Sequence, residues 1–270
     1  MISFDIKDKV VVITGAGGVL CSTMAYEMAQ LGAKIALLDI AEERIAAIAG
    51  EICQSGGEAI SVACNVLETE SITAAKDAVV ARYGRVDVLI NGAGGNKPAA
   101  TASPELSFFD MPADSLSWVL NLNLLGTIYP TQVFGRQMAE QGFGCVINIS
   151  SMSAYTPLTN TVAYSAAKAA VSNFTSWMAT HFAQNYSPKI RVNAIAPGFL
   201  HTQQNHYLLV NSDGTPSARG QKIIAGTPMG RYGRPEEMVG AIVYLCSEAA
   251  SFVTGIVLPI DGGYNSYSGV

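Results

Sequence analysis

Short apolar runs alternate along this chain with longer stretches of helical character. The short runs are rich in Val and Ile and predict strands at Val10–Thr14, Lys34–Asp39, Ala59–Asn65, Val86–Asn91, Cys145–Ser150, Ile190–Pro197 and Gly255–Pro259. The longer stretches predict helices at Leu20–Leu31, Glu42–Ser55, Thr69–Tyr83, Ser115–Glu140, Ala163–Tyr186 and Pro235–Glu248. Continuously apolar strands that alternate with helices are typical of a parallel sheet covered on both faces. The pattern therefore predicts an α/β fold with a doubly wound parallel sheet of seven strands.

Two stretches interrupt this rhythm. Residues 94–113 contain three prolines, and residues 199–229 are polar and irregular around Asn211–Pro216. Each stretch follows a predicted strand, and in open α/β sheets ligands bind beyond the carboxyl ends of the strands. We therefore expect both to line a substrate pocket, with surface loops of no function as the alternative. No repeat or linker divides the chain, so we expect residues 1–270 to form a single domain for cofactor binding and catalysis.

Composition excludes several classes of protein. Hydrophobic residues make up 49% and charged residues only 14%, against about 25% charged in an average soluble domain. This balance excludes a disordered chain and suggests that subunit contacts hide much of the surface. The net charge of −5 lacks the basic footprint of a nucleic-acid binder. The charged N-terminus argues against a signal peptide, and the lack of a long apolar run argues against a membrane span. We therefore expect a cytoplasmic protein.

Cysteine and histidine spacing argues against metal or disulfide chemistry. The five cysteines are scattered, odd in number and without a CxxC pair, which favours a reducing compartment. His201 and His206 are five residues apart with no third histidine near them. We therefore predict no metal site.

A glycine-rich turn, Thr14-Gly15-Ala16-Gly17-Gly18-Val19-Leu20, joins the first predicted strand to the first predicted helix. Such a turn lets backbone N–H groups at a helix N-terminus approach a pyrophosphate. Asp39 ends the second strand, where a carboxylate accepts hydrogen bonds from both ribose hydroxyls and repels a 2′-phosphate. Neither Ile40 nor Ala41 is basic. The turn and Asp39 together predict NAD rather than NADP, with a helix N-cap as the alternative role for Asp39.

Ser151, Tyr164 and Lys168 form a second constellation. Tyr164 and Lys168 are four residues apart in a predicted helix, so their side chains share one face. A lysine cation beside a phenol lowers the phenol's pKa from about 10 toward operating pH, where a general acid–base is most effective. Ser151 directly follows a predicted strand, thirteen residues before Tyr164, and could hydrogen-bond the reacting oxygen. Taken singly, the tyrosine could be a packing residue and the lysine a solvated one.

In their order along the chain, these motifs resemble those of the short-chain dehydrogenase/reductase family, over essentially the full length. The matching segments are Thr14-Gly15, Asn91-Gly92-Ala93-Gly94, Asn123-Leu124-Leu125-Gly126, Ile149-Ser150-Ser151, Tyr164-Ser165-Ala166-Ala167-Lys168, Arg191-Val192-Asn193, Pro197-Gly198-Phe199, residues 230–237 and Asp261-Gly262-Gly263. The resemblance implies a Rossmann-type fold and an NAD(H)-dependent oxidoreductase that acts on CH–OH groups. It also implies a homotetramer with contacts along Ser115–Glu140 and Ala163–Tyr186.

The resemblance further implies a role for each matching residue. Asn123 would hold a water that joins Lys168 to a proton relay, and Ser151 would polarise the substrate carbonyl. Tyr164 would give or take the proton, and Lys168 would also bind the nicotinamide ribose. The other residues implied in cofactor binding are Gly15, Gly17, Gly18, Leu20, Asp39, Asn65, Val66, Asn91, Ala93, Gly94, Tyr164, Pro197, Gly198, Leu200 and Thr202.

Three departures from the family pattern stand out. Val19 and Cys21 occupy positions that usually carry glycines, and we interpret Cys21 as a small packing residue. Asn65 replaces the usual aspartate, although its amide can still accept and donate at an adenine edge. The segment 94–113 is longer than in the plain members of the family.

Two segments resemble a subgroup that acts on sugar acids, the D-mannonate oxidoreductases (fructuronate reductases). They are Gly94-Gly95-Asn96-Lys97-Pro98 and Phe199-Leu200-His201-Thr202-Gln203-Gln204-Asn205. A polyhydroxylated acid needs several hydrogen-bonding groups and one cation for its carboxylate. The hydrogen-bonding candidates are Asn96, Ser151, Gln203, Asn205 and His206, and the candidate cations are Lys97, Arg219 and Lys222.

The sequence therefore predicts interconversion of a hydroxyl and a keto group on a sugar acid, D-mannonate or D-fructuronate. Three alternatives stay open: a gluconate 5-dehydrogenase, a 3-oxoacyl reductase, and a non-catalytic dinucleotide-sensing protein. The intact set of Asn123, Ser151, Tyr164 and Lys168 argues against the last of these.

Overall fold

The computed structural model describes residues 2–202 and 205–269. In this part of the chain seven strands follow the predicted order: β1 (Val10–Thr14), β2 (Lys34–Asp39), β3 (Glu58–Ala63), β4 (Val88–Asn91), β5 (Gly144–Ile149), β6 (Ile190–Pro197) and β7 (Val257–Ile260). They form one sheet in the order β3-β2-β1-β4-β5-β6-β7, and every pairing is parallel. The chain builds outward from β1 to β3 and then reverses at β4, which confirms the doubly wound Rossmann-type fold.

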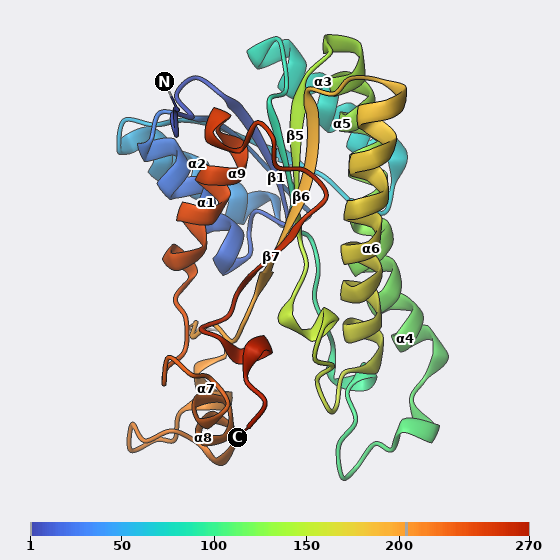
Figure 1. Cartoon of the computed structure of the whole chain (residues 1–270), viewed down its shortest axis with the longest axis vertical. Helices are drawn as coiled ribbons and strands as arrows, with labels where there is room; N and C mark the ends of the chain where they lie inside the picture. The colour runs from blue at the N-terminus through green and yellow to red at the C-terminus, as the bar shows by residue number, and fades with distance from the viewer. Residues whose placement is uncertain (1, 203–204, 270) are drawn as a thin grey trace.

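Helices cover both faces of the sheet (Figure 1). One face is covered by α1 (Val19–Gln30), α2 (Glu42–Gln54) and α9 (Val239–Cys246). The other face is covered by α3 (Thr69–Tyr83), α5 (Gly126–Gln141) and α6 (Val162–Asn185). Beyond the carboxyl ends of the strands lie α4 (Ala113–Leu120) on one side, and α7 (His206–Leu209) with α8 (Ala218–Ala225) on the other. No helix in the described residues is both long and apolar enough to cross a membrane.

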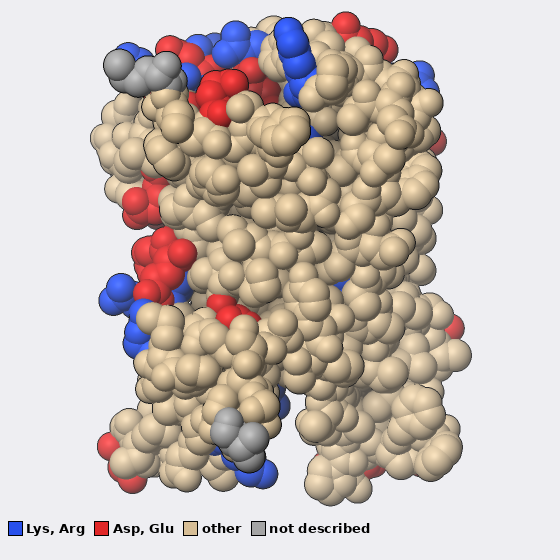
Figure 2. Space-filling view, in the orientation of Figure 1, with Lys and Arg blue, Asp and Glu red and all other residues tan. Residues whose placement is uncertain are grey.

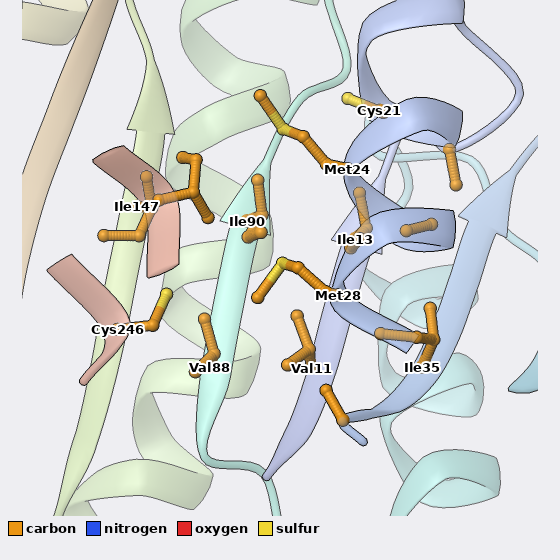
Figure 3. Close-up of a cluster of buried hydrophobic side chains, with 14 of the residues drawn as sticks. Val11, Ile13, Cys21, Met24, Met28, Ile35, Val88, Ile90, Ile147 and Cys246 are labelled. Atoms are coloured by element: carbon orange, nitrogen blue, oxygen red, sulfur yellow. The ribbon is translucent and has the colours of Figure 1, made fainter. Parts of the chain in front are cut away.

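The core consists of two apolar layers, one on each side of the sheet. Strand β1 is buried at all its positions, because successive side chains point to opposite faces and both faces are covered. Val11 and Ile13 join the layer beneath α1 and α9, while Val10 and Val12 join the layer beneath α3, α5 and α6. Figure 3 shows Met24 and Met28 of α1 lying over Ile13 and Val11 in the first layer. This double burial explains why the strands appear in the sequence as continuous apolar runs.

The predicted helix Ser115–Glu140 is divided in the structure. Helix α4 ends at Leu120, residues Asn121–Leu125 form one π-helical turn, and α5 begins at Gly126. A π turn widens the helix by one residue and re-aims its side chains, and such turns are frequent at functional sites. The buried Asn123 lies in this turn. An apolar pattern continuous through the break predicted one helix and gave no signal for the insertion.

The stretch 199–229 is less irregular than predicted, because it contains α7 and α8. Helix α8 begins after Ser217, whose hydroxyl accepts a hydrogen bond from the Gly220 N–H at 3.1 Å. It buries Gly220 and Ile223. This apolar stripe is too short to predict a helix among the polar residues around it. The predicted helix Pro235–Glu248 is divided in the structure into a 3-10 turn at Pro235–Met238 and the helix α9.

Candidate active site

A notch opens at the carboxyl ends of the strands, between two lobes (Figure 2). One lobe contains α7 and α8, and the other contains the segment 94–113 and the loop that precedes α6. The prediction placed the substrate between these same two segments. Parallel sheets bind ligands at this edge, because every strand delivers the loop that follows it to the same place.

Tyr164 and Lys168 lie in the first two turns of α6, and the strand beside them holds the lysine in place. The Lys168 Nζ atom donates a hydrogen bond to the Ile149 carbonyl at 2.8 Å and lies 5.6 Å from the centre of the Tyr164 ring. Ile149 ends β5, and Ser151 follows it. The Ser151 hydroxyl accepts a hydrogen bond from the Ser153 N–H at 3.1 Å and is also hydrogen-bonded to the Tyr164 hydroxyl. The predicted trio therefore converges at one point.

Burial controls the ionisation of this trio. It raises the pKa of Tyr164 above its ordinary value, and the hydrogen bond with Ser151 opposes the rise. Burial also lowers the pKa of Lys168 to about 8, against an opposing contribution from the nearby Cys21. The predicted lowering of the tyrosine's pKa by the lysine is therefore wrong for this state, because desolvation disfavours phenolate and ammonium alike. At pH 7 the site holds a neutral phenol beside an ammonium group, the protonation state that a proton donor requires.

Asn123 connects the segment after β4 to the catalytic residues. Its Nδ2 atom donates to the Gly95 carbonyl at 2.7 Å and to the Val119 carbonyl at 2.8 Å, and its Oδ1 atom accepts from the Gly95 N–H at 3.2 Å. A Cβ atom on Gly94 would lie 2.7 Å from Asn123 Oδ1 and 3.3 Å from Lys168 Nζ. Glycine is therefore needed where this segment passes the lysine. The implied water-holding role of Asn123 stays a prediction.

The glycine-rich turn and Asp39 meet directly at the start of α1. The Oδ2 atom of Asp39 accepts the Gly17 N–H at 2.9 Å, and its Oδ1 atom accepts the Ala41 N–H at 3.0 Å. A Cβ atom on Gly17 would lie 3.1 Å from Asp39 Oδ2. Gly15 has a φ of +64°, and a Cβ atom there would lie 2.7 Å from the Ala93 Cα atom. Asp39 is thus fixed over the turn, and Ala41 rather than Asp39 is the residue that precedes α2.

A cation, Arg44, borders this turn. Arg44 lies in the first turn of α2, and its Cδ atom is 3.4 Å from where a Cβ atom of Gly17 would be. The first turn of α2 brings the fifth residue after Asp39 back to the turn, so the helical period was the signal that could have found it.

Cys21 is a packing residue, as predicted. It is 4% exposed, and its Sγ atom occupies the space next to Gly92 where any larger residue would collide with it. Burial raises the pKa of the Cys21 thiol to about 12. A thiol with this pKa stays protonated and unreactive near neutral pH.

Two of the implied cofactor residues use their side chains elsewhere. The Nδ2 atom of Asn91 donates to Thr131 Oγ1 and to Asn148 Oδ1, both at 2.9 Å, inside the core. The Oδ1 atom of Asn65 accepts the Leu67 N–H at 3.0 Å, and its Nδ2 atom donates to Glu68 at 2.8 Å. The Nδ2 donor of Asn91 is therefore used inside the core, whereas its buried Oδ1 atom has no hydrogen-bond partner among the described residues. The neighbouring Val66 is buried and lies beside Gly126.

The loop after β6 is held by its own asparagine. The Oδ1 atom of Asn205 accepts the Thr202 N–H at 2.9 Å, and its Nδ2 atom donates to the Leu200 carbonyl at 2.7 Å. Both ends of this amide thus bond Leu200 and Thr202, two of the residues implied in cofactor binding, which makes Asn205 a loop-forming residue. Pro197 ends β6, and the Gly198 N–H donates to Ile260 at 3.0 Å.

The substrate candidates are spread over both lobes. Asn96 donates to Thr101 Oγ1 at 2.8 Å, and the Lys97 Nζ atom lies 5.0 Å from the Trp118 ring centre. Arg219 and Lys222 are exposed on α8. His206 Nδ1 and His201 Nε2 are 3.0 Å apart. Gln203 lies outside the described residues, among which no group of three or more His, Cys, Asp or Glu could hold a metal ion.

Comparisons with known proteins agree with this geometry. A family model described as enoyl-(acyl carrier protein) reductase matches residues 17–265. The uncharacterized oxidoreductase UxuB of Bacillus subtilis is 48% identical over 98% of this chain and 98% of its own. A Haemophilus influenzae structure with bound NAD, described as a candidate D-mannonate oxidoreductase, has 48% identity and a TM-score of 0.93 over 98% of each chain. A gluconate 5-dehydrogenase structure from Burkholderia cenocepacia, in complex with NADP and tartrate, has 31% identity and a TM-score of 0.86 over 98% of each chain.

The chain belongs to the short-chain dehydrogenase/reductase family, and it is an oxidoreductase. The prediction of an enzyme is confirmed, and the alternative of a non-catalytic sensing protein is set aside. The cofactor predicted from Asp39 is the one bound in the Haemophilus influenzae structure.

Proposed function

We propose that this protein is an NAD-dependent oxidoreductase that interconverts D-mannonate and D-fructuronate. The observation that carries the proposal is the 48% identity, over 98% of each chain, to the NAD-bound candidate D-mannonate oxidoreductase. The cations on the two lobes support an anionic substrate, because Lys97 belongs to one lobe and the exposed Arg219 and Lys222 belong to the other. A sugar acid needs a cation to replace the water around its carboxylate.

The residues present fit NAD. Each oxygen of Asp39 accepts one backbone N–H, which leaves lone pairs for the two ribose hydroxyls. Gly15, Gly17 and Gly18 lack side chains where the pyrophosphate would approach the N-terminus of α1, and Leu20 lies in its first turn. The nicotinamide would supply or accept the hydride.

The chain's own residues handle the proton. In the reducing direction, the neutral phenol of Tyr164 donates its proton to the substrate's carbonyl oxygen as that oxygen gains charge. The Ser151 hydroxyl, which is hydrogen-bonded to Tyr164, can turn its single proton to the same oxygen and so donate a second hydrogen bond there. The ammonium group of Lys168 stabilises the phenolate that is left. In the oxidising direction the same groups act in reverse order.

A substrate panel tests the proposal. Purified enzyme is assayed for NADH oxidation with D-fructuronate, 5-keto-D-gluconate, a neutral ketose and a 3-oxoacyl thioester, with Tyr164→Phe as the inactive control. We expect kcat/KM to be highest for D-fructuronate by at least about tenfold, which corresponds to about 1.4 kcal/mol of differential transition-state binding. A higher value for any other member of the panel would refute the proposed substrate.

A gluconate 5-dehydrogenase is the second candidate, and one observation favours it. Arg44 borders the glycine-rich turn next to Asp39, where the adenosine ribose would bind, and the Burkholderia cenocepacia gluconate 5-dehydrogenase was solved with NADP. An arginine in this place could receive a 2′-phosphate. Running the panel with NADPH as well as NADH separates the two candidates, because this one predicts the highest kcat/KM for 5-keto-D-gluconate with NADPH.

A further inference from the structure

We propose that the C-terminal segment Asp261–Tyr267 forms the third wall of the substrate notch. In this wall, Asn265 and Thr156 together bind a hydroxyl group of the substrate that is remote from the reacting carbon. The inference rests on the proposed function to the extent that it requires a polyhydroxylated substrate.

The sheet delivers this segment to the site. Strand β7 pairs with β6 so that Ile260 lies beside Pro197, and both strands end at the edge where the catalytic residues lie. The contact continues past the strands, because a Cβ atom on Gly198 would lie 2.6 Å from the Asp261 Cα atom. In Figure 1 the chain after β7 runs between the α7–α8 lobe and the loop that leads into α6.

Asp261 fixes the shape of the segment. Its Oδ1 atom accepts the Gly263 N–H at 2.9 Å, and its Oδ2 atom accepts the Asn265 N–H at 2.8 Å. Gly262 and Gly263 have φ values of +64° and +88°, a pair of left-handed residues that other side chains rarely allow. The side chains of Tyr264 and Asn265 are therefore presented in defined directions.

The segment contacts both lobes of the notch. The Tyr264 ring lies edge-on to Phe199 with 5.2 Å between ring centres, and its Cε2 atom is 3.1 Å from where a Cβ atom of Gly226 would be. On the opposite side, the Thr156 hydroxyl donates to Asn265 Oδ1 at 3.0 Å. Thr156 lies in the loop that connects Ser151 to Tyr164. The segment thus spans from the α8 lobe to the catalytic loop.

The Thr156–Asn265 pair has the chemistry of a hydroxyl-binding site. The bond between them uses the Oδ1 atom of Asn265 as the acceptor. The Nδ2 donor of Asn265 has no partner within the described chain, and the Thr156 oxygen keeps lone pairs that can accept a hydrogen bond. One donor and one acceptor side by side match a sugar hydroxyl, which both donates and accepts. A site that hydrogen-bonds a hydroxyl discriminates strongly against an analogue that lacks it.

Two substitutions test the inference. Thr156→Val replaces the hydroxyl with a methyl group of similar size, and Asn265→Ala removes the amide. Each should raise KM for D-fructuronate about tenfold or more, keep kcat within about twofold, and leave the Kd for NADH unchanged. Neither should change KM for the analogue deoxygenated at the hydroxyl farthest from the keto group. Because both residues bind one hydroxyl, the double variant should be little worse than either single variant.

Thr180→Val and Asn185→Ala are the matched controls, since both residues are exposed in the part of α6 that is remote from Tyr164. They should behave as the wild type does. If the wild-type enzyme reduces sugar acids and both test variants keep KM within about twofold, the third wall is refuted and the proposed function stands. If the wild type reduces only acyl ketones, both ideas fail together. A loss of kcat equal for the natural and deoxygenated substrates would show a merely structural role and also refute the inference.

Discussion

Tyr164 and Lys168 illustrate how one buried pair can be suited to both directions of a redox reaction. Burial keeps the phenol neutral and brings the pKa of the lysine down to about 8, so a modest change in charge near the pair alters both. A low local dielectric strengthens every such interaction. The chemistry of the site therefore depends on exclusion of water as much as on the identity of its residues.

Removing one hydroxyl tests the proton transfer. Tyr164→Phe keeps the ring that packs beside Lys168 but cannot donate a proton, so kcat should fall by about 10²–10⁴-fold. NADH affinity, measured by fluorescence titration, should change little, because the ring and the lysine remain. A variant with near-normal turnover would contradict the assignment of Tyr164 as the proton donor.

Cofactor choice should depend on Asp39. In Asp39→Ala combined with Ile40→Arg, the carboxylate that repels a 2′-phosphate is lost and a cation is gained beside Arg44. We expect kcat/KM with NADPH to rise and kcat/KM with NADH to fall. The matched control is Ile40→Arg alone, which keeps the carboxylate and should change the preference less. A wild-type enzyme that prefers NADPH would overturn the prediction of NAD.

Some site residues could be identified from sequence and others could not, for a physical reason. Tyr164 and Lys168 are four apart on one helix, so local geometry alone predicts that they face the same way. The side chain of Asn91 instead bonds Asn148, 57 residues away. Such long-range partners are set by the packing of the sheet, and no local pattern encodes them.

At the scale of elements, strand positions were predictable, while interruptions of helices were not. A buried parallel strand has a strong signature, and β1, β2 and β6 have the predicted bounds. The π turn at Asn121–Leu125 and the short α8 carry no comparable signature, because tertiary contacts stabilise them. Both elements border the notch, and departures from regular local structure are expected at functional sites.

Helix α8 and the segment 94–113 provide the test of carboxylate recognition. We expect one of Lys97→Ala, Arg219→Ala or Lys222→Ala to raise KM for D-fructuronate strongly and to leave NADH affinity unchanged. An unpaired carboxylate is costly to take out of water, whereas loss of a solvated cation costs little. The structure makes Lys97 the more constrained candidate, because its ammonium group already lies over the Trp118 ring. If all three variants keep KM within about twofold, either neutral groups hold the carboxylate or the substrate is not an acid.

At the scale of the molecule, the fold class followed from the alternation of strands and helices, but the path of the last residues did not. The contacts of Asn265 with Thr156 and of Tyr264 with Phe199 join segments that are far apart in the chain. They exist only once the sheet is assembled. The third wall of the notch is thus a property of the whole fold.

The surface of the molecule leads to the last prediction, a homotetramer. Only 14% of the residues are charged, and large aromatic side chains are exposed on two helices of one side: Trp118 on α4 is 42% exposed and Trp177 on α6 is 57% exposed. Exposed aromatic groups of this size are typical of subunit interfaces.

Sedimentation equilibrium at micromolar concentration should therefore give the mass of four chains. Trp177→Glu should shift the mass toward smaller species, because a carboxylate would have to lose its water inside the contact. Ala47→Glu, on the exposed face of α2, is the matched control and should leave the mass unchanged. A wild-type monomer at this concentration would refute the tetramer, and a Trp177→Glu tetramer would place the contacts on other surfaces.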